Sequence, residues 1–264
     1  MAEPIHKIII TGTGRTGTTF LVQLLTELGL DTGYTRKNWS HDYFEHCDAG
    51  LEFDVFAKDA PYIVKNPDFC ETLPALLATG KFKVDHVLVP IRELGAAAQS
   101  RIRVGGAHGN VPGGLVGTAD PAAQKAVLAE SFHHLLFTLT EHDIPHTLLH
   151  FPRIVRDPEY TRAKLQFLMP GVDRNAFDAA FQSAAQPKLV HEFDSKPAEA
   201  PGHAGARFLM AEHRKRIRRR VKRVAAAIVI LGAALLAAHL LNVRSASRAP
   251  VSSDVSPAAS GTRG

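Results

Sequence analysis

Apolar residues recur along the first part of the chain in short runs separated by turn residues. Residues 8–10 form a continuous apolar run, which is typical of a buried strand. From Thr18 to Leu28 the apolar positions fall three and four residues apart, which is the spacing of a helix face, and Gly29 supplies a stop signal. A glycine-rich turn joins the two segments. The pattern therefore predicts a strand, a loop and a helix in succession.

The same alternation continues as far as residue 185. It predicts further strands at 62–65, 84–91 and 146–151, and helices at 73–77, 93–102, 122–143, 158–167 and 174–185. We expect a loop with short helical pieces at 33–56, and a mobile loop, a candidate lid, at the glycine-dense stretch 105–117. Strands that alternate with helices predict a parallel sheet. The expected fold class is a three-layer α/β/α domain of the phosphate-binding-loop type over residues 1–194.

The C-terminal part follows a different pattern. Residues 195–212 have the composition of a linker, and 213–223 contain eight Lys and Arg residues. The next eighteen residues, 224–241, carry no charge, and at about 1.5 Å per residue they reach roughly 27 Å, enough to cross a hydrocarbon core. We expect a single transmembrane helix there, with the basic side in the cytoplasm and a disordered tail at 242–264. The alternative is an alanine-rich buried or interfacial helix, and His239 counts in its favour.

The charge distribution follows the same boundary. The whole chain has 31 basic and 26 acidic residues, of which 213–264 hold 11 and 1, so residues 1–212 hold 20 and 25. The first part therefore carries −5 and the second +10, which argues against a nucleic-acid-binding face on the globular part. Cys47 and Cys70 lack CxxC spacing, and residues 1–7 lack the apolar stretch of a signal peptide. We expect reduced thiols and a domain that folds in the cytosol.

The glycine-rich turn has the residues of a phosphate-binding loop. Gly12, Gly14 and Gly17 let the backbone approach an anion at a helix N-terminus, where unpaired N–H groups and the helix dipole favour negative charge. The motif G-x-x-x-x-G-K-[ST] is matched over residues 12–19, but Thr18 stands at the lysine position. The nearest cation is Arg15, inside the loop.

Magnesium chemistry is not favoured by the rest of the pattern. An ATPase or a kinase needs an apolar strand that ends in a magnesium-binding Asp, whereas the later strands end at Arg92 and Pro152. His41, His46 and Cys47 lack the spacing of a four-ligand metal site, so no metal is expected. The loop therefore indicates an anion chemistry that works without magnesium.

These residues resemble those of the sulfotransferases that use 3′-phosphoadenosine 5′-phosphosulfate (PAPS). The stretch GTGRTGTTFL resembles their 5′-phosphosulfate-binding loop, in which Lys or Arg stands at the position of Arg15. Their second signature, an Arg at a strand end and a Ser eight positions later, is matched by Arg92 and Ser100. In IVKNPD, Lys65 stands where many members carry a catalytic lysine. The resemblance extends roughly over residues 7–168.

The resemblance implies in-line transfer of a sulfuryl group from PAPS to an acceptor hydroxyl. Arg15 would stabilise the charge on the bridging oxygen, Lys65 would add a second positive charge, and Arg92 with Ser100 would bind the 3′-phosphate. The 5′-phosphate would lie on the loop residues Gly12, Thr13, Gly14, Arg15, Thr16, Gly17, Thr18 and Thr19. The acceptor would be a small molecule, a glycan or a lipid-linked hydroxyl compound.

The acceptor hydroxyl also needs a general base. Asn66, Pro67 and Asp68 stand where some members carry a histidine, so Asp68 is one candidate. Other members use a Glu some thirty residues beyond the loop cation, where this chain has Asp42 and Glu45. We expect Glu45 ahead of Asp42. Two other functions stay open on the same fold: a magnesium-dependent kinase or NTPase, and a non-catalytic, membrane-tethered nucleotide-binding protein.

Overall fold

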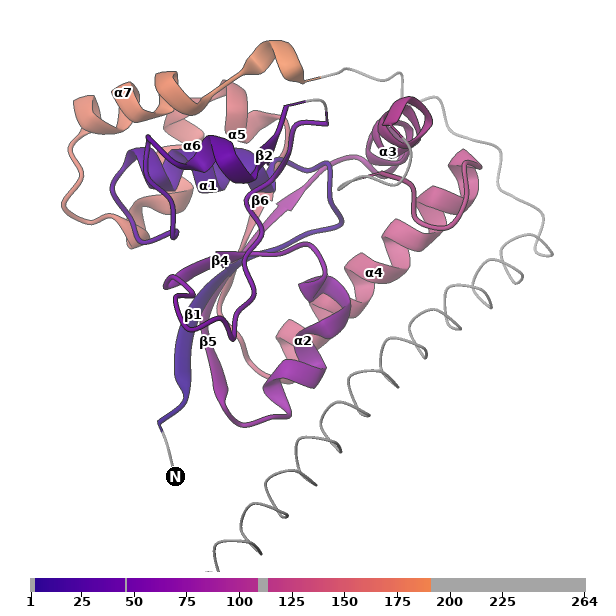
Figure 1. Ribbon diagram of the computed structural model, residues 1–264, viewed down its shortest axis with the longest axis horizontal. Coiled ribbons are helices and arrows are strands. Elements are labelled where there is room, and N and C mark those ends of the chain that lie inside the picture. The colour runs from indigo at the N-terminus through magenta and orange to yellow at the C-terminus, as the bar shows by residue number, and fades with distance from the viewer. Residues whose placement is uncertain (1–2, 46, 109–113, 191–264) are drawn as a thin grey trace, which may run out of the picture. The chain divides into compact units, whose positions relative to one another are not determined.

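The computed structural model describes residues 3–45, 47–108 and 114–190 (Figure 1). By its internal contacts the chain divides into two units, Met1–Ala211 and Glu212–Gly264, and every described residue belongs to the first. The predicted linker, basic segment, transmembrane helix and tail lie outside the described residues. Within the described residues, no helix has the length and apolar character needed to span a membrane.

A parallel sheet of four strands forms the centre of the domain. Its strands stand in the order β4 (Ile63–Lys65), β1 (Ile5–Ile10), β5 (Phe82–Ile91) and β6 (His146–His150), and each neighbouring pair is parallel. Parallel neighbours require crossover connections, which the intervening helices supply. The carboxyl ends of all four strands therefore lie at one edge of the sheet.

Pro90 lies inside β5, although β5 is a central strand. Leu88 is the last β5 residue paired with β1, and its carbonyl accepts from the N–H of Thr11. Backbone groups of residues two apart point to the same side of a strand, so the nitrogen of Pro90 faces the β1 side, as the carbonyl of Leu88 does. At that level β1 has already ended. The missing N–H of Pro90 thus removes no ladder hydrogen bond.

Helices cover both faces of the sheet (Figure 1). One face carries α1 (Thr18–Glu27), α5 (Arg153–Arg156), α6 (Pro158–Leu165) and α7 (Arg174–Ala184). The other carries α2 (Phe69–Leu77) and α4 (Pro121–Glu141), with α3 (Leu94–His108) packed on α4. The expected three-layer α/β/α architecture with a parallel sheet is present.

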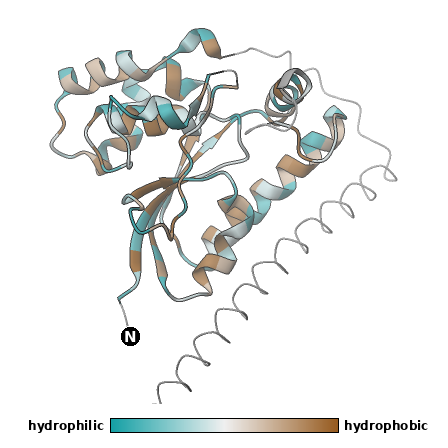
Figure 2. Ribbon diagram, viewed as in Figure 1, coloured by the Kyte–Doolittle hydropathy of each residue, from teal (hydrophilic) through white to brown (hydrophobic). Residues whose placement is uncertain are grey.

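The two layers have separate apolar cores because successive strand residues face opposite sides. In β1, Ile8 and Ile10 pack with α1 and α7, whereas Ile9 packs with α2 and α4. The strands carry both brown and teal segments in Figure 2: residues 8–10 of β1 and 87–89 of β5 are apolar and buried, whereas His6 and Lys83 near the strand starts are exposed. Phe177 of α7 is fully buried against α1.

Two segments predicted as loops contain regular structure. The loop expected at 33–56 contains a short hairpin of β2 (Tyr43–Phe44) and β3 (Ala49–Gly50) beside a 3₁₀ turn (Trp39–Asp42). Helix α3 continues to His108, so the first four residues of the glycine-dense stretch are helical rather than a mobile loop. Periodicity cannot reveal two-residue strands or a four-residue helix such as α5.

Candidate functional site

The loop after β1 has a left-handed backbone at three positions. Gly14, Arg15 and Gly17 have φ values of 74°, 59° and 92°. Left-handed residues in a turn of this kind direct successive N–H groups to one side and form an anion-binding concavity. Gly17 is the N-cap of α1 and makes no side-chain cap, so the first N–H groups of the helix face the loop. A non-glycine residue at positive φ, as at Arg15, is strained and often functional.

A cleft opens over this loop at the carboxyl edge of the sheet. It contains about 850 Å³ of space free of atoms, part of it open to solvent. Its polar lining comes from the loop, the start of α1, the hairpin region, the ends of β4 and β5, and α3. It includes Gly14, Arg15, Gly17, Thr18, Thr19, Asp48, Glu52, Lys65, Arg92 and Ser100. Its apolar lining includes Phe20, Phe151, Val155, Ala184, Leu189 and Val190.

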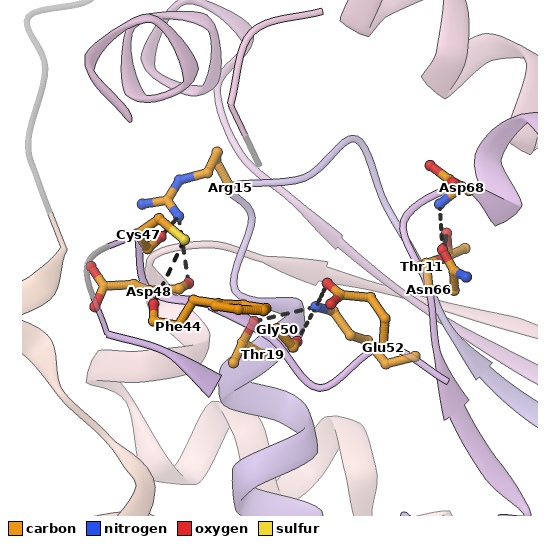
Figure 3. A network of polar contacts seen from close by, with 11 residues as sticks. Thr11, Arg15, Thr19, Phe44, Cys47, Asp48, Gly50, Glu52, Asn66 and Asp68 are labelled. Carbon is orange, nitrogen blue, oxygen red and sulfur yellow. Dashed lines mark hydrogen bonds and ion pairs between the residues drawn. The ribbon is translucent and has the colours of Figure 1, made fainter. Parts of the chain in front are cut away.

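Arg15 and Ser100 are brought into direct contact. Arg15 Nε donates to Ser100 Oγ at 3.1 Å, and Arg92 Nη1 donates to the carbonyl of Arg15 at 3.2 Å. The guanidinium of Arg15 also donates to the carbonyls of Cys47 and Asp48 in the hairpin (Figure 3). The three predicted anion-binding side chains therefore form one group, although they stand on three different elements.

Burial and mutual repulsion destabilise the charges of this group. Burial lowers the pKa of Arg15, with the Asp48 carboxylate acting against it. The pKa of Arg92 falls to about 10, first through burial and then through the nearby Arg15 charge. Desolvated cations that repel one another are stabilised by a bound anion.

Lys65 lies at the end of β4 and points into the cleft. Its side chain is 2% exposed, and Nζ donates to Gly50 O and Glu52 Oε1, both at 2.5 Å, and to Thr19 Oγ1 at 3.4 Å. Burial lowers the pKa of Lys65, and the Glu52 carboxylate opposes that change. Glu52 is 30% exposed at its side chain and lines the cleft.

The predicted general bases lie elsewhere. Glu45, Asp42 and Asp68 are exposed and do not line the cleft. Asp68 stands beside Asn66, apart from Arg15 and Glu52 (Figure 3). The carboxylates that the fold brings into the cleft are Asp48 and Glu52. Neither Asp48 nor Glu52 was predicted from the sequence. Asp48 reaches the cleft because the hairpin pairs, and Glu52 because it contacts Lys65, and no local sequence signal reveals either contact.

Three loop residues support the cleft from behind rather than line it. The carbonyl of Thr13 accepts from Arg101, a residue that sequence analysis did not single out. Gly12 lies so close to the Pro90 carbonyl that a Cβ would come within 3.1 Å of it. Thr16 is fully buried, and its hydroxyl makes no hydrogen bond with the described residues.

The described residues hold no group of three or more His, Cys, Asp or Glu side chains that could bind a metal ion. Cys47 and Cys70 are both free and buried. Burial raises the pKa of each thiol, that of Cys70 to about 12.

No family model matches the chain, and no curated protein matches it. Among solved structures it is similar to the sulfotransferase domain from the Synechococcus PCC 7002 olefin synthase, with 13% identity and a TM-score of 0.48 over 81% of this chain and 96% of that one. It is also similar to the sulfotransferase domain from the curacin biosynthetic pathway, with 14% identity and a TM-score of 0.42 over 80% of this chain and 98% of that one. Both of these structures are sulfotransferase domains, which is also the family that the sequence resembles. At such low scores, the function of this chain has to rest on its own residues.

Proposed function

We propose that this protein is a sulfotransferase that moves a sulfuryl group from PAPS to an acceptor hydroxyl. The observation that carries the proposal is the grouping of Arg15, Arg92 and Ser100 around a left-handed loop at a helix N-terminus. Such a loop suits one phosphate, and a guanidinium beside a serine suits a second. A nucleotide with phosphates at both ends of its ribose matches the two positions.

The residues of the cleft fit this donor in kind. Backbone N–H groups from Gly14 to Thr19 would hold the 5′-phosphate, and Arg92 with Ser100 the 3′-phosphate. PAPS supplies the activated sulfuryl group. Arg15, which now donates to Ser100, would turn toward the bridging oxygen and stabilise the charge that develops there. Lys65 would neutralise charge on the transferring group.

We infer that Glu52 accepts the proton of the acceptor hydroxyl, in place of the bases predicted from sequence. Glu52 lines the cleft and lies 2.5 Å from the lysine that would face the transferring group. A base must come within hydrogen-bond reach of the hydroxyl it activates, and the exposed carboxylates at 42, 45 and 68 stand outside the cleft.

We further propose that residues 224–241 hold the protein in a membrane, with the catalytic domain on the cytoplasmic side. The absence of charge in this stretch and the eight basic residues before it support this arrangement. A glycan or a lipid-linked compound would be the acceptor best placed for such an enzyme.

The test is calorimetric titration of the full chain with adenosine 3′,5′-bisphosphate, ADP and ATP with magnesium. We expect the bisphosphate to bind most tightly and without magnesium. Equal affinities, or tighter binding of ATP with magnesium, would reject the sulfotransferase in favour of a kinase or NTPase. Binding of the bisphosphate with no transfer from PAPS to any hydroxyl compound would favour a non-catalytic nucleotide-binding protein.

A further inference from the structure

Arg101, which follows Ser100 in α3, is a charged residue with only 8% of its surface exposed. Its guanidinium donates twice to the carbonyl of Thr13, from Nη2 at 2.5 Å and Nε at 3.2 Å, and once to the carbonyl of Gly114 at 2.6 Å. None of the ion pairs between described residues includes it. An ion pair therefore does not explain why Arg101 is buried. Burying a cation that only carbonyl groups compensate is costly, so another role for this residue has to be sought.

The contact with Thr13 determines which way one peptide of the loop faces. The C=O of Thr13 and the N–H of Gly14 belong to the same planar trans peptide, and they point in opposite directions. The guanidinium lies against Gly14 so closely that a Cβ there would overlap it. With the carbonyl turned toward Arg101, the N–H of Gly14 faces the other side, where Gly14 lines the cleft.

Arg92 holds the loop in the same manner two residues later. It donates to the carbonyl of Arg15 at 3.2 Å, so the carbonyls of residues 13 and 15 are both bound by arginines from the β5–α3 segment. Alternate peptides of the loop are thus oriented by side chains outside the loop. This arrangement leaves the intervening N–H groups available to an anion.

Arg101 also connects the loop to the chain that follows the undescribed residues 109–113. Gly114 is buried, and the segment after it is held by Gln124, which is fully buried and donates to the carbonyls of Val116 and Thr118. The described end of the glycine-dense stretch is therefore anchored to α4 and, through Arg101, to Thr13.

We propose that Arg101 is a positioning residue of the anion-binding loop: it holds the Thr13–Gly14 peptide with its N–H toward the bound anion and links that peptide to the segment beginning at Gly114. The identity of the anion as a nucleotide 5′-phosphate rests on the proposed function. The orientation of the peptide does not.

The experiment uses the full chain and the variant Arg101→Lys, which keeps the charge but loses the forked donor geometry. Adenosine 5′-monophosphate, adenosine 3′-monophosphate and the 3′,5′-bisphosphate are titrated into each protein by calorimetry. We expect affinity for the two ligands with a 5′-phosphate to fall about tenfold or more, the order of one charge-assisted hydrogen bond, while the 3′-monophosphate binds as before. Arg36→Lys, a change at an exposed arginine that pairs with Glu27 and does not line the cleft, is the matched control and keeps all three affinities.

A second readout is the backbone amide of Gly14 in ¹⁵N-labelled protein during titration with inorganic phosphate. In the original chain this amide proton should shift on binding, and in Arg101→Lys the shift should be lost while the melting temperature stays close to that of the Arg36→Lys control. A merely structural role would lower the melting temperature and the affinity for all three nucleotides together, and that result would overturn the proposal.

Two further outcomes separate this proposal from the sulfotransferase function. If Arg101→Lys binds the 5′-monophosphate as the original chain does, or if Gly14 never responds to phosphate, the positioning role is wrong. If Gly14 responds and Arg101→Lys abolishes the response, but the bisphosphate has no advantage over ADP, the role of Arg101 stands and the sulfotransferase function fails.

Discussion

At the scale of single residues, the site consists of cations that the fold holds close together against their repulsion. Burial, and after it the charge of Arg15, lowers the pKa of both Arg92 and Arg101, and Arg15 lies within hydrogen-bond distance of Ser100. Each arginine donates to at least one main-chain carbonyl, which partly compensates for the lost water. The arrangement is most stable with an anion present, so ligand binding should stabilise the fold by linkage.

Replacing Arg92 should remove the preference for a 3′-phosphate. Arg92→Ala leaves Ser100 and the loop but removes the guanidinium from the cleft, so we expect adenosine 3′,5′-bisphosphate to lose about tenfold or more in affinity. Adenosine 5′-monophosphate should lose much less affinity, because for this ligand the change removes only the contact between Arg92 and the Arg15 carbonyl. Calorimetric titration measures both, and an equal loss for the two ligands would place the 3′-phosphate elsewhere.

Replacing Glu52 should remove turnover without removing donor binding. Glu52→Gln keeps an acceptor for Lys65 Nζ but cannot take a proton, so kcat should fall roughly 10²- to 10⁴-fold while bisphosphate affinity changes little. The measurement is the rate of transfer from PAPS together with calorimetry. Glu45→Gln separates the two hypotheses about the base, because a comparable loss in that variant would support the base predicted from sequence and contradict the role of Glu52.

The buried Cys70 thiol should make the protein less stable in alkali. Its pKa is about 12 in the folded chain against an ordinary 9.0, so the unfolded chain loses this proton first as the pH rises. The stability linked to Cys70 is therefore fully present below about pH 9 and is lost between that pH and about 12. From about pH 8 to 10 the free energy of unfolding should fall by roughly 1 kcal/mol more in the original chain than in Cys70→Ala, as measured by urea denaturation. Equal pH dependence of the two proteins would show that Cys70 does not titrate in this way.

At the scale of elements, short polar signals determine where helices begin. Asp120, Asp157 and Asp173 each accept a hydrogen bond from the backbone N–H three residues later, at the starts of α4, α6 and α7. Such N-caps are encoded locally, and the sequence placed the starts of these three helices within one residue. The hairpin has no such signal, because its two strands of two residues are defined by their pairing.

Removing one of these caps should weaken the fold without changing the cleft. Asp173→Ala deletes the acceptor for Ala176 N–H at the start of α7, and we expect a loss of about 1 kcal/mol in the free energy of unfolding. Urea denaturation measures the loss. Bisphosphate affinity measured on the same variant should stay within about twofold, and a larger drop would mean that α7 contributes more to the site than its contact at Ala184.

At the scale of the whole molecule, the parallel sheet assembles the site. Because β1, β4 and β5 end at one edge, the loop after β1 lies beside Lys65 and Arg92, which are far from it in sequence. Ligands of open α/β sheets bind at this edge. The described domain and the apolar stretch at 224–241 are separate units of the chain, and the second needs its own test.

The proposed membrane segment should bind bilayers through its apolar residues. The full chain should float with phosphatidylcholine vesicles at high salt, where the basic segment at 213–223 is screened and the lipid is neutral. Ile228→Arg combined with Leu235→Arg places two charges in the stretch, each costing about 3 kcal/mol at the membrane centre. This variant should stay in the dense bottom fraction, apart from the vesicles. Flotation of this variant to the same extent would contradict a transmembrane helix at 224–241.

The sequence alone determined the alternation of strands and helices, the phosphate-type loop and the residues Arg15, Lys65, Arg92 and Ser100. The alternation and the loop with its Arg15 follow from periodicity and glycine placement, which act over short stretches of chain, whereas Lys65, Arg92 and Ser100 were indicated by the resemblance to sulfotransferases. The tertiary structure alone decided that Glu52 meets Lys65 in the cleft, and that Arg101 binds Thr13 across 88 positions of sequence. Contacts of this kind depend on how the sheet aligns distant strand ends and on which charges can be buried together, and neither is written in the local order of residues.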